Sequence, residues 1–417
     1  MRFVRGLGLA LCACVSLFAV GAYADESVGD TAPSFIDALF GGDFSASLRY
    51  HYAHIDQANL SDDARASTYQ LLLGYQTGAY NGFSGMVQVR QVGVIGDERY
   101  NSTINGLTQY PVEADPDAGE IDQLYLRYAG IENLAVTVGR RKLNWGNQRF
   151  VSALGWRQNN RSFDGAVVEY GPVNDLAFRY AYASNVNRAF TDDSPVGNFD
   201  GDFHLFNGIY SGLGFGDATA YAYINDFEDA FALGLSSQTY GVNFTGRTAM
   251  NNVTLGLTLE FANQSDYGNN PGSFDLNYYR VEPSLATGGF TFRVGYELLE
   301  GDGSNAFQTP FALLHAYNGW ADQFLSTPAN GLQDNYASAS YRFGPESPEP
   351  LEGVSVTVAY HDFQADEGSM DYGTEWDAVV NVPLGEHFSL SFKAADYDAD
   401  SWKVDTQKFW IVFTARY

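Results

Sequence analysis

The sequence predicts an all-β fold: a transmembrane antiparallel β-barrel of about eighteen strands, with short periplasmic turns and long outer loops. Apolar and polar residues alternate along most of the chain, which is the period of a β-strand. After the N-terminal segment, no stretch has the roughly 18 to 20 continuous apolar residues that a transmembrane helix needs. The predicted connections alternate between short and long, which is typical of outer-membrane barrels.

The N-terminus has the pattern of an export signal. Two arginines precede an apolar run at 6–21, and Ala22-Tyr23-Ala24 provides a small-x-small cleavage site. We therefore expect cleavage after Ala24 and localisation in the bacterial outer membrane. Lipidation of Cys14 is an alternative, but the lipobox before it is only partial. The expected domains are a signal peptide (1–24), a periplasmic N-terminal segment (25–42) and an outer-membrane barrel (43–417).

Cysteine content and charge exclude several classes of function. Cys12 and Cys14 both lie in the export signal, so the mature chain has no disulfide, thiolate zinc site or cysteine nucleophile. The chain carries 23 basic and 50 acidic residues, a net charge of −27 that becomes −29 when the two signal arginines are removed. Such acidity argues against nucleic acid as a partner.

Alternation is clearest in the segment 406–417, where Phe409, Ile411 and Phe413 share one face and the chain ends on the aromatic Tyr417. This ending is similar to the insertion signal of outer-membrane barrels and predicts the barrel-insertion machinery as a partner. A soluble sandwich would alternate in the same way, but it has no reason to place every long loop at one end. The expected strands are 44–54, 66–77, 82–94, 121–129, 133–141, 163–171, 176–184, 203–212, 218–225, 237–247, 251–262, 276–286, 289–299, 333–343, 353–362, 372–383, 386–396 and 406–417.

Acidic residues gather in the predicted outer loops, where we expect mainly a solvated surface. One group has the oxygen ligands of a loose calcium site without the spacing of an EF-hand. No other cofactor is expected. The calcium candidates are Glu113, Asp115, Asp117 and Glu120.

Strand parity predicts a basic lumen, with six more basic than acidic side chains facing inward. A narrow channel focuses the field of such a lining and favours anions, and arginine binds carboxylates bidentately. Alternatively, the arginines pair with inward acids and only brace the wall. The predicted lining bases are Arg49, Arg90, Arg127, Arg141, Arg179, Arg247, Arg280, Arg293, Arg342, Lys393, Lys408 and Arg416. The inward acids are Glu169, Glu260, Glu282, Glu297, Glu375 and Asp377, whereas Asp122 falls on an apolar face.

The fifth connection carries a second basic cluster interleaved with tryptophans. It could fold inward and narrow the pore, with arginines binding carboxylates and tryptophans stacking on sugar rings. An external loop ordered by its own stacking is the alternative. The constriction candidates are Arg140, Lys142, Trp145, Arg149, Trp156, Arg157 and Arg161.

Three stretches resemble the alginate-export family of outer-membrane porins. They are Gly139-Arg140-Arg141-Lys142-Leu143-Asn144-Trp145-Gly146-Asn147-Gln148-Arg149-Phe150 with its continuation to Gly165, Tyr279-Arg280-Val281-Glu282-Pro283, and the segment from Gly295 to Asp322 that contains His315-Ala316-Tyr317-Asn318-Gly319-Trp320. The resemblance implies a monomeric eighteen-stranded barrel whose arginine-lined constriction passes anionic polysaccharide. This chain is shorter than a dedicated polymer exporter and has an acidic exterior, so uptake of oligosaccharides or small solutes fits as well.

The leading hypothesis is thus a passive channel for anionic saccharides, in contact with outer-membrane lipid and lipopolysaccharide. The alternatives are a small-solute porin, a barrel enzyme and a plugged structural barrel. An enzyme is not expected, because no Gly-x-Ser-x-Gly, His-Glu-x-x-His or P-loop motif is present. His315 near Asp322 is expected to pack a loop rather than to catalyse. Inward glycines argue against a plug, because they leave space in the lumen; they are Gly74, Gly241, Gly256 and Gly295.

Overall fold

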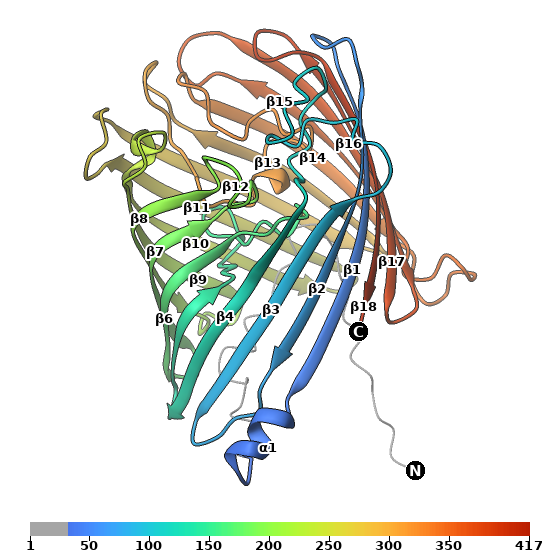
Figure 1. The fold of residues 1–417 in the computed structure, drawn as a ribbon. Coiled ribbons are helices and arrows are strands. Elements are labelled where there is room, and N and C mark those ends of the chain that lie inside the picture. Colours follow the sequence, from blue (N-terminus) through green and yellow to red (C-terminus); the bar gives the residue numbers. More distant parts are fainter. Residues whose placement is uncertain (1–31) are drawn as a thin grey trace.

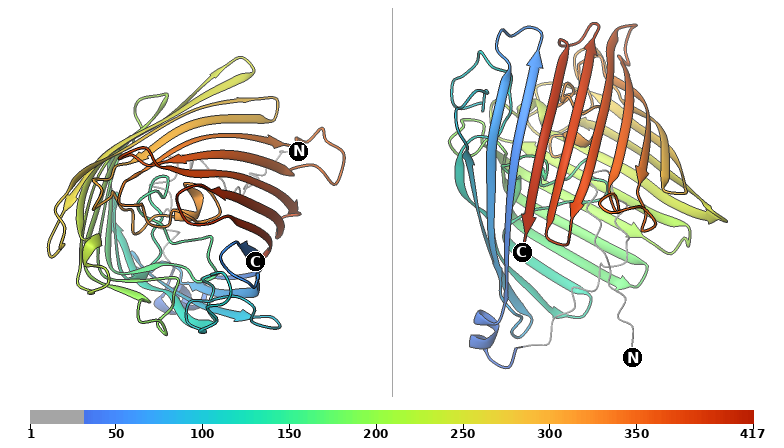
Figure 2. Two further views of the ribbon diagram at one scale, coloured as in Figure 1. Left: turned by 90° about the horizontal axis from the view of Figure 1, so that it is seen from above. Right: turned by 90° about the vertical axis from the view of Figure 1, so that its right-hand side faces the viewer.

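The computed structural model describes residues 32–417, and the predicted export signal lies outside them. Eighteen antiparallel strands form one sheet that closes into a barrel, because β18 pairs with β1 from Ser47 opposite Arg416 to Gln57 opposite Thr406 (Figures 1 and 2). Both the predicted fold class and the strand count are confirmed. No helix of residues 32–417 is long and apolar enough to cross a membrane.

Each strand pairs with its neighbours in the sequence. The strands are β1 (Asp43–Gln57), β2 (Ala64–Gln76), β3 (Phe83–Val94), β4 (Ala118–Ile131), β5 (Leu134–Arg141), β6 (Ser162–Val173), β7 (Leu176–Asn187), β8 (Asn198–Tyr210), β9 (Gly216–Phe227), β10 (Ser237–Met250), β11 (Val253–Asp266), β12 (Asp275–Thr287), β13 (Phe290–Leu299), β14 (Leu332–Arg342), β15 (Ser355–Gln364), β16 (Asp371–Leu384), β17 (Phe388–Ala399) and β18 (Thr406–Arg416). The helical elements are α1 (Phe35–Phe40), η1 (Leu233–Leu235) and η2 (Leu314–Ala316).

Several strands run further toward the long-loop end than the sequence predicts. β1 extends to Gln57, β7 to Asn187, and β8 already begins at Asn198. The hydrogen-bonded ladder continues there into polar sequence, where neither face meets lipid and the alternation signal disappears. The sequence therefore marks the lipid-facing part of each strand better than its end.

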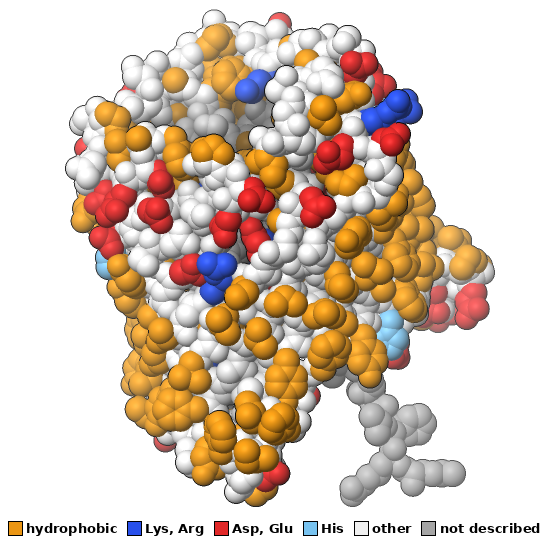
Figure 3. Space-filling model, viewed as in Figure 1, with side chains coloured by type: hydrophobic (Ala, Val, Ile, Leu, Met, Phe, Trp, Pro, Cys, Tyr) orange, Lys and Arg blue, Asp and Glu red, His pale blue; other side chains and the backbone are white. Residues whose placement is uncertain are grey.

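The outer wall carries a band of apolar side chains, shown in orange in Figure 3. Leu126, Val138 and Val242 are each more than half exposed, whereas their strand neighbours face the lumen. Exposure on this scale suits a lipid-facing surface, because a water-soluble monomer does not leave so large an apolar band open. The alternation of the sequence thus gives the inward and outward faces correctly on most strands.

A β-bulge corrects the prediction for Asp122. The register of β3 and β4 shifts between Gln88 and Val89, so that Asp122 stands as an additional residue opposite this step. The extra residue turns Asp122 away from the apolar face and into the barrel, where it is fully buried. Strict alternation along the strand could not predict the inward position of Asp122, because the extra residue of the bulge shifts the alternation by one.

Two long connections fold into the barrel and supply its core: the first lumen loop (residues 142–161, between β5 and β6) and the second lumen loop (residues 300–331, between β13 and β14). Viewed from above, the orange segment with η2 lies inside the ring of strands (Figure 2, left). Phe150 of the first loop packs on Tyr221 and Tyr278 of the wall and on Phe307 of the second loop. The hydrophobic core therefore lies between the loops and the inner wall.

The inward glycines do not leave open lumen, contrary to the prediction. Gly241 pairs with Tyr221 across the strands, and the Tyr221 ring occupies the space that a Cβ at Gly241 would take. Gly295 accommodates the Tyr336 ring in the same way. These glycines let cross-strand aromatic rings lie flat on the wall, so they carry no argument against a filled lumen.

Candidate functional site

The two lumen loops meet in an aromatic cluster around one lysine. Trp156 of the first loop stacks on His315 of the second, with ring centroids 4.0 Å apart and planes 8° apart. The Lys393 Nζ lies 2.6 Å from His315 Nε2, 3.8 Å from the Trp320 ring centroid and 4.4 Å from that of Trp156. Lys393 was predicted to line the pore, and the structure places it under both loops instead, with only 8% of it exposed.

A second junction centres on Arg149 of the first loop, which is almost completely buried. Its Nε donates to Glu297 Oε1 at 2.8 Å and its Nη2 to Asn318 Oδ1 at 3.0 Å. The guanidinium also lies over the Tyr317 ring, 4.7 Å from the centroid. One side chain thus ties the first loop to the wall strand β13 and to the second loop.

A third junction is an ion-pair chain through Arg157 and Asp322. Arg157 donates to Glu113 Oε1 at 2.7 Å and pairs with Asp322 Oδ2 at 3.3 Å, and Lys408 of the wall lies 3.1 Å from the same oxygen. Burial opposes charge on Asp322, but Lys408 and His315 hold the pKa of this carboxyl well below its usual range. Burial, followed by the charge of Lys393, lowers the pKa of His315 to about 3.

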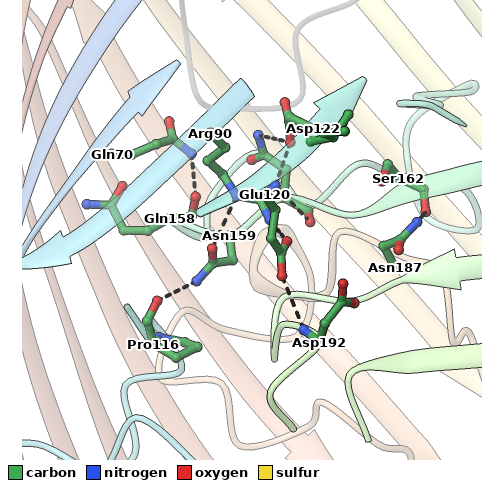
Figure 4. Close-up of polar contacts among 12 residues, drawn as sticks. Gln70, Arg90, Pro116, Glu120, Asp122, Gln158, Asn159, Ser162, Asn187 and Asp192 are labelled. Atoms are coloured by element: carbon green, nitrogen blue, oxygen red, sulfur yellow. Dashed lines mark hydrogen bonds and ion pairs between the residues drawn. The ribbon is translucent and has the colours of Figure 1, made fainter. Parts of the chain in front are cut away.

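Arg90 of β3 joins the first loop to the wall (Figure 4). It donates to Glu120 and, at 2.5 Å, to Asp122 Oδ1, and its Nε lies 3.2 Å from Asn159 Oδ1 in the first loop. Lys142 pairs with the second oxygen of Asp122 at 2.5 Å. Arg90 and Lys142 are therefore neutralised by carboxylates rather than open to a solute.

Arg49 and Arg161 hold the first loop through main-chain carbonyls. Arg49 donates to the carbonyls of Gly155 and Arg157. Arg161 donates to Pro310 and Ala312 of the second loop, and burial lowers the pKa of its guanidinium to about 9, helped by the nearby Arg188. Neither arginine forms an ion pair with a carboxylate of residues 32–417. Arg161 is buried, whereas Arg49 remains partly exposed.

Two further predicted lining arginines also pair with inward acids. Arg280 donates to Glu282 Oε2 at 2.9 Å, and Arg141 approaches Glu169 Oε2 at 3.4 Å. Arg127 and Arg179 lie on the inner wall and also have interaction partners. The bracing role that the sequence left open thus applies to much of the lining.

Arg140 does not belong to the constriction. It stands opposite Leu124, an exposed apolar residue of the outer wall, and therefore shares the outward face of β5. It forms a bidentate pair with Asp164 at 2.8 and 2.9 Å. Trp145, another constriction candidate, is buried in the core between loop and wall.

The remaining predicted arginines gather near the short turns, at the periplasmic end of the lumen. Arg247, Arg342 and Arg416 are exposed, and no carboxylate of residues 32–417 forms an ion pair with any of them. Arg293 has only a long contact of 3.9 Å to Glu282. Arg247 and Arg293 lie on the same row of cross-strand neighbours. Between them stand only Gly256 and Ser284, whose side chains are absent or small. This end of the lumen is the part in which positive charge stays accessible.

The predicted set of inward acids is incomplete, and Asp334 and Asp217 are two of those it omits. Asp334 is buried and accepts from His361 Nδ1 at 2.9 Å and Asn318 Nδ2 at 3.2 Å. It has the same parity as Arg342 on β14, so the alternation could have found it. Asp217 faces inward on β9 one residue before the predicted strand begins. Together with Asp122, these acids reduce the predicted surplus of positive charge in the lumen.

The four calcium candidates do not come together. Glu113 and Asp115 lie beside His51 of β1, whereas Glu120 pairs with Arg90. Asp117 lies near Gln91, and the distance from Gln91 Nε2 to Asp117 Oδ1 is 3.4 Å. Spacing in the loop alone could not show which of these acids turn inward.

A closed barrel with an even number of strands, an apolar outer band and polar loops folded inside defines a porin-type barrel of the bacterial outer membrane. Solved structures agree at the level of fold. Acinetobacter baumannii OccAB4 matches with a TM-score of 0.71 at 15% identity, covering 90% of this chain and 97% of that one. Pseudomonas aeruginosa OpdK with vanillate matches with a TM-score of 0.69 at 15% identity, covering 91% and 99%.

Within this class, the model of the alginate-export family matches residues 41–209, from just before β1 to the end of β8. This match confirms the resemblance and includes the stretch from Gly139 to Gly165. The other two stretches that carry the resemblance lie beyond the matched range. A search of the curated proteins found no match.

Proposed function

We propose that the chain is a passive outer-membrane channel for anionic saccharides such as short uronate oligomers. The observation that carries this proposal is the group of accessible arginines at the periplasmic end, Arg247, Arg342 and Arg416, which have no ion pair with the described acids. Guanidinium groups in a narrow pore attract carboxylates and bind them bidentately. The loop arginines contribute less, because protein partners already occupy them.

The packing of the lumen loops limits the size of the solute. The loops are joined to each other and to the wall by buried ion pairs and stacked rings, so a full-length polymer would have to displace them. Oligomers and single carboxylates need a smaller opening. OpdK, which shares the fold, was solved with vanillate, an aromatic carboxylate, and this favours a small-carboxylate porin as the second candidate.

The same proposal covers the surroundings of the barrel. Its apolar band would contact outer-membrane lipid and lipopolysaccharide, and the strand that ends at Tyr417 would engage the barrel-insertion machinery. The signal would direct export and be cleaved after Ala24, and the mature protein would function as a monomer. Measuring the oligomeric state of the protein in native lipid discs would test whether it is a monomer.

The primary test is single-channel recording of the refolded mature chain in planar bilayers under a KCl gradient. We expect a reversal potential that indicates chloride preference, and block by oligomeric alginate but not by neutral maltodextrin. Block by vanillate alone would favour the small-carboxylate porin. Cation preference would refute the proposal, and a folded barrel without conductance would support the plugged alternative.

A further inference from the structure

A buried group of one imidazole and two carboxylates lies where β1, the loop 95–117 and the first lumen loop meet. His51, Glu113 and Asp115 each offer a ligand atom, and these atoms lie within 4.8 Å of one another. Exposure of the three residues is 2%, 0% and 0%, respectively. Among residues 32–417, they form the one such cluster that could hold a metal ion.

Two atoms of this group lack a partner. His51 Nε2 and Glu113 Oε2 are buried, and neither has a hydrogen-bond partner within the described part of the chain. Buried polar atoms are almost always satisfied, and an orphaned one costs roughly 1 to 3 kcal/mol. Each of these two buried atoms is therefore available to a ligand that the described part of the chain does not itself supply.

The neighbouring contacts define which atoms are available. Arg157 occupies Glu113 Oε1 at 2.7 Å, which leaves Oε2 open. Asp115 Oδ2 lies 2.9 Å from His51 Nδ1, and its Oδ1 accepts from the Gln158 main chain at 3.0 Å. These contacts hold the two carboxylates and the imidazole in place before any ligand binds.

We propose that His51, Glu113 and Asp115 bind a divalent transition-metal ion, with Zn²⁺ as the reference case. An imidazole nitrogen with two carboxylate oxygens is a donor set for zinc and its neighbours, whereas calcium takes oxygen ligands in larger number. Zinc bonds of about 2.0 to 2.2 Å put tetrahedral ligands roughly 3.3 Å apart. Ligand atoms that lie within 4.8 Å of one another therefore need only small side-chain movements to bind one ion. Water completes the coordination.

The metal would join the wall to the loop 95–117, and Arg157 extends this link to a third part of the molecule. His51 belongs to the wall and both carboxylates to the loop 95–117, while Arg157 carries the link on to the first lumen loop and Asp322. Binding would therefore restrain the loops that fill the lumen. The inference does not depend on which solute passes, since metal affinity can be measured in a closed or an open barrel.

The test uses the full mature chain, refolded in detergent, stripped with chelator and dialysed against ZnCl₂. We expect one zinc per chain, and at least tenfold weaker binding in His51→Gln and Glu113→Gln. His54→Gln is the matched control, because His54 lies on the same strand on the outer face, and its zinc binding should stay unchanged. Heat-modifiable migration in gels confirms that each variant is folded.

A second measurement tests directly whether an imidazole binds the metal. Cu²⁺ is added to the wild-type chain at one equivalent, and pulsed electron paramagnetic resonance detects coupling to one imidazole nitrogen. Absence of this coupling, or binding that His51→Gln leaves intact, would overturn the proposal. Calcium that displaces zinc with equal affinity would overturn the assignment to a transition metal.

Discussion

At the residue scale, a single arginine decides how firmly the first lumen loop is held. Arg149 is 1% exposed and pairs with Glu297, which is equally buried. Removing one partner of a buried pair leaves a charge without compensation, and this usually costs more than the pair itself contributes. Exposed arginines such as Arg247 have no such dependence.

Arg149→Met should lower the free energy of unfolding by about 3 to 5 kcal/mol, because Glu297 would remain buried without its counter-charge. Urea titration followed by tryptophan fluorescence measures the change. Arg247→Met is the control and should stay within about 0.5 kcal/mol, since Arg247 is exposed. Equal stability of both variants would contradict the structural role assigned to Arg149.

Gly319 is a second point of single-residue control. Its φ of +81° suits glycine, and a Cβ there would collide with the Glu375 carboxylate. Gly303 in the same loop has a similar φ of +85°, but the atom nearest to its added Cβ, Asn330 Oδ1, is 3.5 Å away. Comparing alanine substitutions at Gly319 and Gly303 therefore separates the cost of backbone strain from the cost of a steric collision.

Gly319→Ala should destabilise the second lumen loop by about 1 to 3 kcal/mol more than Gly303→Ala, because only the first adds a collision to the backbone cost. Limited proteolysis of the folded barrel would show earlier cleavage within residues 300–331. Similar protease resistance in both variants would mean that Glu375 does not support the loop.

At the scale of elements, the lumen loops are held by groups that respond to acid. His315 has a pKa of about 3 when packed, against 6.5 as its ordinary value. Between pH 6.5 and about pH 3, His315 is therefore protonated more readily when the loop is released than when it is packed. The packing of the loop weakens as the pH falls through this range. The groups around His315 are Lys393, Asp322, Arg157 and the rings of Trp156 and Trp410.

Loop packing should accordingly be unchanged above about pH 6.5 and should weaken progressively toward pH 3. Asp322 adds to the loss only below its ordinary pKa of 3.8, because its packed pKa is lower still. Channel conductance, measured from pH 7 to pH 4, should rise as the loops release. His315→Gln should flatten the rise, whereas a rise that persists unchanged would rule out His315 as its source.

The sequence predicted the elements far better than their packing. Each strand faces lipid on one side, so apolar residues such as Leu126 and Val138 repeat with period two and reveal the strand. A loop that folds inward has no such period, because its burial depends on what the wall offers. Trp156 and Arg149 therefore stood out by residue type alone, while their partners His315 and Glu297 could not be identified before folding.

At the scale of the whole molecule, charge is distributed along the pore axis. Bases in the middle are compensated by Glu120, Asp122, Glu297 and Asp322, while those at the periplasmic end stay accessible. Parity predicted the inward bases, but not Asp122, which a bulge redirects. Arg140, expected in the constriction loop, instead pairs on the outer face of its strand. The net lumen charge is thus a property of the assembled barrel.

Replacing Arg247, Arg342 and Arg416 together by glutamine should reduce the anion-to-cation permeability ratio several-fold, because these arginines carry the accessible positive charge. Reversal potentials under a KCl gradient measure the ratio. Lys403→Gln is the control, since Lys403 is an exposed cation in an outer loop, and it should leave the ratio unchanged. An unaffected triple variant would place the selectivity elsewhere.

The seam between β1 and β18 has a kinetic consequence. Every other strand pair joins neighbours in the sequence, so each hairpin can form soon after its residues meet. The seam joins the two ends of the chain, with Ala46 and Tyr417 exchanging main-chain hydrogen bonds of 2.8 and 2.9 Å. Until it closes, two strand edges expose unpaired amides that lipid cannot satisfy. Closure is the most non-local step of assembly, so substitutions at the seam should slow barrel formation more than equally destabilising substitutions in the β10–β11 hairpin.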